Sequence, residues 1–290
     1  MVRLPGILKV ISILILDFVA IYTLFGNAAI AFAVTGVIAL YVWLGGYLAL
    51  FKEDAVSSKK LPSYEEGRLE SVRVRLIEDV KNVSAANISN LKVYLIPGND
   101  DMNATAYGAN CVSVTRGTFN NADPITLAAV LGHEISHILN YDAEFNRAVF
   151  ISATLIVGAI SVLYAVAMVF IFLIFLILNC FRSWLGILVF KRTKKVTGGI
   201  FGLLQRGVDV FYRGILGLVS RHAEYRCDSY SCNLGYGIQL SHFLSIAAPY
   251  SQRPLTLTEA LYRSHPPAEK RIARLEGQMS KMNSIVRRGI

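Results

Sequence analysis

The chain has 290 residues, of which 54% are hydrophobic and 17% are charged. Soluble globular proteins have roughly 25% charged residues, so this composition excludes an ordinary soluble protein. The apolar residues are concentrated in long runs, which predicts an integral membrane protein. The formal net charge is +9, and the basic residues cluster beside the apolar runs. We therefore expect them to face anionic lipid headgroups of a bilayer, and we expect no nucleic acid partner.

Two apolar runs, residues 7–25 and 28–51, lie close together near the start of the chain. Each is long enough for a transmembrane helix, which needs about 20 residues. A signal peptide is the alternative for the first run, but no small-residue cleavage site precedes the second run. We therefore predict that residues 1–51 form a retained transmembrane hairpin. Asp17 within it should face protein, water or the polar interface, because a charge is costly in lipid.

The polar block that follows, residues 52–147, combines helix and strand patterns. Its first segment, from Ser63 to about Val83, predicts an amphipathic helix because apolar residues recur at helical spacing. These residues are Leu69, Val72, Leu76, Val80 and Val83. Residues 91–96 and 111–115 are strand candidates. We expect the strand 111–115 to lie at a sheet edge, where it could bind an extended peptide by strand addition.

An H-E-x-x-H motif at residues 133–137 is the most informative feature for chemistry. Asp123, followed by Pro124 at the first helical position, predicts a helix that begins there and carries the motif. Histidines at positions i and i+4 share one helical face, so both imidazoles can reach one metal ion. Glu134 between them can hold a water molecule and accept its proton. The alternative is a helix with two solvated histidines and a surface glutamate.

A third apolar region, residues 148–190, separates this motif from any metal ligand farther along the chain. Because all ligands must lie on one side of the membrane, the chain must cross it an even number of times in between. Residues 148–190 can form a two-span hairpin, which places the basic residues at 191–195 in the cytosol. Alternatively, 148–180 and 199–219 form one span each. Charge placement favours the hairpin, and the two alternatives remain open.

Glu224 is the best candidate for a third ligand, since catalytic zinc sites usually have three protein ligands and one open position. Asp228, one helical turn later, can accept a hydrogen bond from a ligand imidazole and so select its tautomer. The alternative is an acidic pair on a solvated helix. Cys227 is close to these residues and could contact the metal, but a single thiol off the ligand face is more often a packing residue. The four cysteines form no C-x-x-C pair, as expected for a reducing compartment.

The order of these motifs resembles the HtpX family of membrane-embedded zinc endopeptidases, which are related to the CAAX prenyl-protein proteases. The H-E-x-x-H motif is followed, after a hydrophobic block, by S-R-x-x-E-Y-x-x-D at residues 220–228. Cys227 stands where the family usually has alanine. Other segments similar to the family are Asn103-Ala104-x-Ala106-x-Gly108, Val114-Thr115-Arg116-Gly117, Ser264-His265-Pro266-Pro267, and Glu269 with Arg271.

The resemblance implies an α+β fold: a mainly helical multi-span membrane protein with a zincin-like metalloprotease domain facing the cytosol. It implies a prokaryotic inner membrane and favours the second arrangement of spans. The expected organisation has four parts. These are the hairpin 1–51, a first part of the catalytic domain at 52–147, a membrane insertion at 148–219, and a second part of the catalytic domain at 220–290.

For the site, the resemblance implies that His133, His137 and Glu224 bind one Zn²⁺ per subunit. Glu134 acts as the general base, and His265 stabilises the developing oxyanion. The function implied is a zinc-dependent endopeptidase that cleaves membrane or misfolded proteins. One alternative is specific processing of a single partner. Another is a non-catalytic membrane scaffold with a structural or degenerate metal site, against which the intact glutamate of the motif argues.

Four further residues are expected around this centre. Asp228 and Asp142 should hydrogen-bond to the metal-binding histidines, although Asp142 could also be a simple helix-end acid. Asn103 and Ala104 precede the strand at 111–115 in the segment similar to the family, and we expect them to contact the substrate.

Overall fold

The computed structural model describes residues 3–52, 56–57, 61–84, 86–108, 110–181, 183–247 and 265–287. The chain folds as two compact units, one made of residues 1–148 and 217–290 and the other of residues 149–216. Residues 256–263, for which the sequence also predicts a helix, lie outside the described residues.

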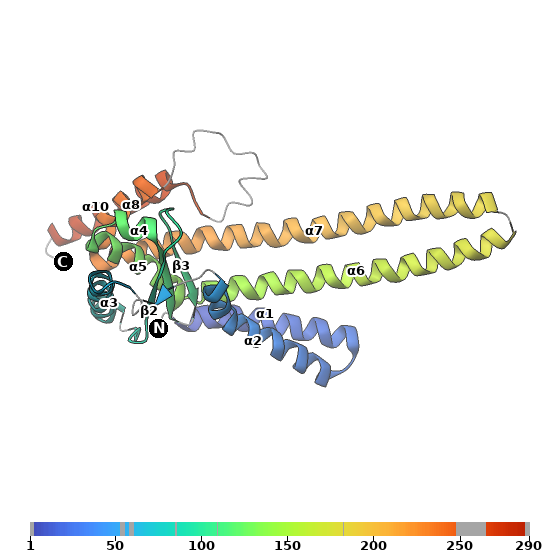
Figure 1. The fold of residues 1–290 in the computed structure, drawn as a ribbon, viewed down its shortest axis with the longest axis horizontal. Coiled ribbons are helices and arrows are strands. Elements are labelled where there is room, and N and C mark those ends of the chain that lie inside the picture. The colour runs from blue at the N-terminus through green and yellow to red at the C-terminus, as the bar shows by residue number, and fades with distance from the viewer. Residues whose placement is uncertain are drawn as a thin grey trace. The chain divides into compact units, whose positions relative to one another are not determined.

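The first unit begins with a helical hairpin, α1 (Arg3–Phe25) and α2 (Ala28–Lys52). The two helices lie side by side (Figure 1). Segments Gly6–Phe25 and Ala28–Gly46 are both long and apolar enough to cross a membrane, as the composition predicts. Asp17 is only 8% exposed, so it faces protein, as expected for an acid within an apolar helix.

A four-stranded sheet follows, built from β1 (Val56–Ser57), β2 (Lys92–Ile96), β3 (Ala104–Gly108) and β4 (Cys111–Thr115). Its order is β1-β2-β4-β3, with β4 parallel to β2 and antiparallel to β3. The strand predicted at 111–115 is therefore confirmed, but its assignment to a sheet edge is wrong. Because β3 pairs with β4 on the side away from β2, β3 forms this edge of the sheet and all five residues of β4 are buried.

Helices α3 (Ser63–Ser84) and α5 (Pro124–Leu139) supply much of the core together with the sheet. The amphipathic pattern of α3 is confirmed for its first four apolar positions, whereas Val83 is 49% exposed at the end of the helix. The predicted start of α5 is also confirmed. The Asp123 carboxylate accepts hydrogen bonds from the backbone N–H groups of Ile125 and Thr126, and Pro124 occupies the first turn. A short helix, α4 (Arg116–Asn121), lies between β4 and α5.

The hairpin contacts the edge strand at a glycine. A Cβ atom on Gly46 of α2 would lie 2.0 Å from the carbonyl oxygen of Tyr107 in β3, so only glycine allows this approach. Arg147 joins the same elements, because its guanidinium donates to the carbonyl oxygens of Val42 and Tyr107. The apolar hairpin and the sheet edge are thereby held together.

The remaining helices are α6 (Asp142–Phe181), α7 (Ser183–Ser231), the π-helical turn η2 (Cys232–Tyr236), α8 (Gly237–Ala247) and α10 (Ala268–Arg287). Within the second unit α6 and α7 run antiparallel (Figure 1). Aromatic pairs Tyr164–Phe201 and Phe175–Phe190 join them, with ring centroids 5.2 and 5.1 Å apart.

The course of α6 decides between the two predicted arrangements of residues 148–219. Because α6 is continuous to Phe181, residues 148–190 do not form two spans, and that alternative is wrong. The segments 148–180 and 199–219 instead lie in separate helices, as the second alternative requires. Of the described helices, the first two and α6, over Asp142–Cys180, are long and apolar enough to cross a membrane. A crossing by 199–219 stays a prediction.

The difference in burial between Val80 and Val83 of α3 can be tested directly. Val80→Ala should lower the free energy of unfolding by about 2 kcal/mol, because each buried methylene contributes roughly 0.8 kcal/mol and a cavity remains. Val83→Ala is the matched control and should have little effect, since Val83 is half exposed. Denaturant unfolding of the detergent-solubilised protein, followed by circular dichroism, measures both. Equal losses would contradict the packing of α3.

Candidate metal centre

The last turns of α7 pack against α5, where the H-E-x-x-H motif lies. Ser231 of α7 donates to the carbonyl oxygen of Ala129 at 2.8 Å. A Cβ on Gly132 would meet a Leu234 methyl group at 3.1 Å, so the small residue before His133 permits close packing. This packing brings together segments that are far apart in the chain.

The three predicted metal ligands, His133, His137 and Glu224, lie close together at this contact between α5 and α7. Glu224 lies between the two histidines, with its carboxylate oxygens 3.5 Å from Nε2 of His133 and 3.5 Å from Nε2 of His137. The imidazole ring centroids are 5.0 Å apart. Glu224 is only 2% exposed. Two imidazole nitrogens and a buried carboxylate facing one point are a donor set that fits a divalent metal ion such as zinc.

Each imidazole is oriented by a second carboxylate. Nδ1 of His133 lies 3.0 Å from Asp228, and Nδ1 of His137 lies 2.9 Å from Asp142. When a ring is neutral and its Nδ1–H donates to a carboxylate, Nε2 on the Glu224 side is left as an acceptor that can bind a metal ion. Arg271 also approaches Nδ1 of His133, at 3.4 Å. We assign the proton to the bond with Asp228 because that contact is shorter.

Basic residues balance the buried carboxylates. Arg271 of α10 donates two hydrogen bonds to Asp228, at 2.8 and 2.6 Å, and its Nη1 lies 2.9 Å from Oε2 of Glu224. Arg226 and Lys9 form ion pairs with Asp142. The sequence indicated Arg271 only as part of a C-terminal segment that is similar to the HtpX family. A basic residue on an otherwise solvated helix gives no indication that its side chain is buried.

The ion pairs shift the protonation of the cluster. Burial would lower the pKa of His133, but its hydrogen bonds to Asp228 and Glu224 raise that pKa to about 10. Burial would raise the pKa of Glu224, but hydrogen bonds from His133, His137 and His265 hold it far below its usual range. Without a metal ion, protons on the imidazoles therefore compensate the buried carboxylate.

Glu134 is the remaining charged residue of the H-E-x-x-H motif. Burial raises the pKa of its carboxyl group, and the positive charges of His137 and His133 oppose that shift only in part. The carboxylate accepts a hydrogen bond from the backbone N–H of Ala106 in β3. Glu134 is thereby held against the edge strand of the sheet.

A cavity of about 300 Å³ opens beside these residues. Glu134, Asn103 and Ala104 line it, together with His133 and Glu224 and the apolar side chains of α8. Asn103 and Ala104 thus lie at the same cavity as the glutamate of the motif. This arrangement is suited to a substrate backbone lying along β3.

His265 also lines the cavity and is 65% exposed. Its Nδ1 atom lies 2.9 Å from Oε1 of Glu224. Sequence reasoning expected this imidazole to act on a substrate oxygen, and that role stays a prediction. Its contact with Glu224 was not anticipated.

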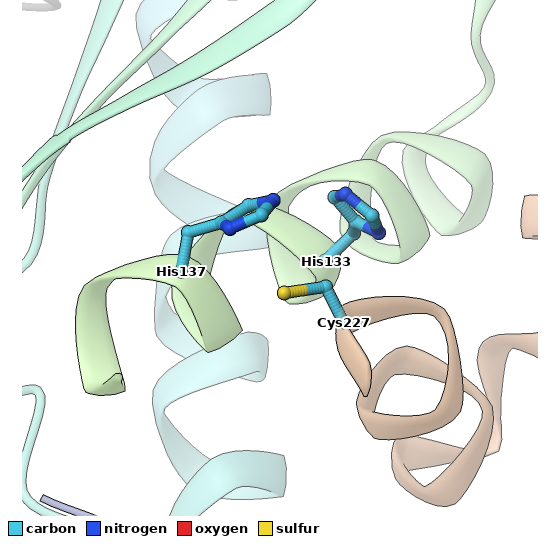
Figure 2. Close-up of side chains that lie close together, drawn as sticks. All are labelled: His133, His137 and Cys227. Carbon is cyan, nitrogen blue, oxygen red and sulfur yellow. The ribbon is translucent and has the colours of Figure 1, made fainter. Parts of the chain in front are cut away.

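The sequence left two interpretations of Cys227 open, packing off the ligand face and contact with a metal ion, and the position of its side chain favours the second. Cys227 follows Glu224 by three residues and therefore shares its helical face. Ligand atoms of His133, His137 and Cys227 lie within 4.8 Å of one another. Figure 2 shows the Cys227 side chain directed from α7 toward the part of α5 that carries both histidines.

The chain is similar to known proteases over most of its length. Residues 63–279 match the family model "Peptidase family M48". A protease HtpX homolog of Salinibacter ruber is 32% identical over 203 residues, which are 64% of this chain and 67% of that protein. One from Acidiphilium cryptum is 27% identical over 277 residues, 85% of each chain.

A structural comparison found the crystal structure of S. mikatae Ste24p. It has 17% sequence identity and a TM-score of 0.35, and it covers 88% of this chain and 65% of that one. The family assignment does not depend on this likeness. The match to the family model covers strands β2, β3 and β4, the helix α5 with the H-E-x-x-H motif, the helix α7 with Glu224, and α10 as far as Met279. The chain belongs to Peptidase family M48, and with its long apolar helices it is a membrane protease of the metalloprotease type.

Proposed function

We propose that this protein is a zinc-dependent endopeptidase whose metal is held by His133, His137 and Glu224. The observation that carries the proposal is the convergence of two carboxylate-oriented imidazoles on one buried carboxylate, beside a cavity that Glu134 lines. A purely structural site would have no need of a glutamate there. One zinc ion per subunit fits this set of donors.

Zinc bound at this position supplies Lewis acidity, which polarises a substrate carbonyl and lowers the pKa of a water molecule. Glu134 takes the proton of the attacking water and later delivers it to the leaving amine. Its raised pKa suits both steps, because a carboxylate with an ordinary pKa is a poor proton donor near neutral pH.

Asp228 and Asp142 keep the two imidazoles in the tautomer that binds metal. His265 lies at the rim of the same cavity, where an imidazole N–H can donate to the oxyanion that develops on the substrate. Asn103 and Ala104 contact the substrate backbone. An extended peptide pairs with β3, the edge strand, and so passes Glu134.

As a protease, the protein acts on polypeptides, and we propose membrane or misfolded proteins as its substrates. The support is the contact between the apolar hairpin and β3, which holds the sheet edge close to a helix pair suited to a bilayer. The basic residues beside the apolar helices favour a cytosolic catalytic domain in a prokaryotic inner membrane. We include protein quality control in the proposal because the resemblance to the HtpX family implies it.

The roles of the two glutamates can be separated. Glu134→Gln should retain zinc and lose cleavage of casein by roughly 10²–10⁴-fold, since a general base contributes about that much. Glu224→Ala should lose both zinc and cleavage, because it removes a ligand. Metal analysis and casein cleavage in detergent measure the two properties side by side.

Glu65→Gln is the control for loss of a buried glutamate outside the cavity and should keep zinc and cleavage. Full zinc and activity in Glu224→Ala would place the third ligand elsewhere. A wild-type protein that binds zinc and cleaves nothing would favour the scaffold function.

The orienting carboxylates give a second prediction. Asp228→Asn should raise the Kd for zinc by about 10–100-fold, because the amide no longer selects the Nδ1–H tautomer of His133. Asp209→Asn is the matched control, since Asp209 is half exposed and pairs with Arg213 on the same helix. Competition with a zinc-binding dye measures both constants. An unchanged Kd for Asp228→Asn would show that His133 needs no such partner.

Removal of the metal provides a third prediction. Treatment with a chelator should abolish cleavage by the wild-type protein, and stoichiometric zinc should restore it. A cleavage rate that stays unchanged when the remaining zinc is far below one ion per enzyme molecule would contradict a metal-dependent mechanism.

A further inference from the structure

We propose that the thiolate of Cys227 is a fourth protein ligand of the metal and closes the site in the resting enzyme. The proposal rests on the metal site described above. It concerns a residue that the three-ligand scheme does not use.

The position of the sulfur is the first argument. Ligand atoms of His133, His137 and Cys227 all lie within 4.8 Å of one another (Figure 2). Zn–N distances of about 2.0–2.1 Å and Zn–S distances of about 2.3 Å put tetrahedral donor atoms roughly 3.3–3.8 Å apart. A small rotation of side chains therefore suffices to bring the sulfur into the same coordination sphere.

The helix geometry is the second argument. Cys227 follows Glu224 by three residues on α7, so both side chains face the histidines of α5. The resulting set is two imidazole nitrogens, one carboxylate oxygen and one sulfur. The carboxylate of Glu224 lies 3.5 Å from Nε2 of each of these two histidines. Four donors complete the tetrahedron that zinc prefers.

Burial of the thiol is the third argument. Cys227 is 0% exposed, so no solvent competes for its sulfur. A thiolate is a strong ligand for zinc and for cobalt, stronger than the water it would replace. Cys232, five residues later, differs: its sulfur lies against Gly237 of α8, 2.8 Å from where a Cβ of that residue would be.

Closure has a functional consequence. A catalytic zinc site keeps one position open for water, whereas a site with four protein ligands is closed. Here the sulfur occupies the position that water needs. Exchange of the thiolate for water is then required before Glu134 can act, so the resting enzyme is latent.

Cobalt substitution tests the ligand directly. Zinc is removed from the full-length protein in detergent, and Co²⁺ is added to one equivalent. A sulfur–cobalt bond produces a near-ultraviolet charge-transfer band, which nitrogen and oxygen ligands do not produce, whereas visible bands report tetrahedral cobalt whatever the ligands. We expect both signals in the wild type and in Cys232→Ala, and we expect loss of the near-ultraviolet band in Cys227→Ala and Cys227→Ser.

Three outcomes overturn the proposal. If the wild type shows visible bands at one equivalent of cobalt without the near-ultraviolet band, Cys227 is not a ligand and the three-ligand site stands. Persistence of the band in Cys227→Ala assigns it to another thiol. Absence of all cobalt binding removes the metal site itself, and the proposed function with it.

Closure of the metal site by Cys227 is tested by the rate of casein cleavage per bound zinc ion. Cys227→Ala should cleave casein faster than the wild type, with Cys232→Ala unchanged, because the open position no longer has to be vacated. An equal or lower rate in Cys227→Ala, with the cobalt band lost, would show that the sulfur binds without limiting catalysis.

Discussion

The buried charge of Glu224 is the constraint on which the rest of the site depends. A carboxylate with almost no exposure is costly unless it is paired and hydrogen-bonded. Glu224 meets this requirement with His133, His137, His265 and Arg271, all within 3.5 Å. These partners come from two parts of the chain, and Glu224 itself lies in a third, so the charge can be buried only when all three parts are packed together.

Arg271 links the charges of the site to one another. Its guanidinium contacts Asp228 and Glu224 at once, so one cation balances both a candidate ligand and the carboxylate that orients His133. A planar guanidinium suits this role because it presents several donors in a fixed arrangement. Removing a partner from such a buried network leaves an uncompensated charge. The helix α10 is therefore part of the site, although it carries no candidate metal ligand.

The edge strand joins the site to the membrane-associated hairpin. The backbone of β3 donates to Glu134 through Ala106, and the next residue, Tyr107, packs against Gly46 of α2. A peptide bound along β3 would therefore lie between the glutamate of the motif and a helix suited to a bilayer. This arrangement connects the proposed chemistry to substrates that are themselves in or near a membrane.

Local patterns in the sequence determined the apolar helices, the start of α5 at Asp123 and the shared face of His133 and His137, because each depends on neighbours within a few residues. The sequence also pointed to Glu224 through its spacing from Asp228. Only the tertiary structure decided that β3 rather than β4 is the sheet edge, that Arg271 is buried, and that Cys227 faces the histidines. These facts depend on how distant segments pack, and short-range periodicity carries no information about such packing.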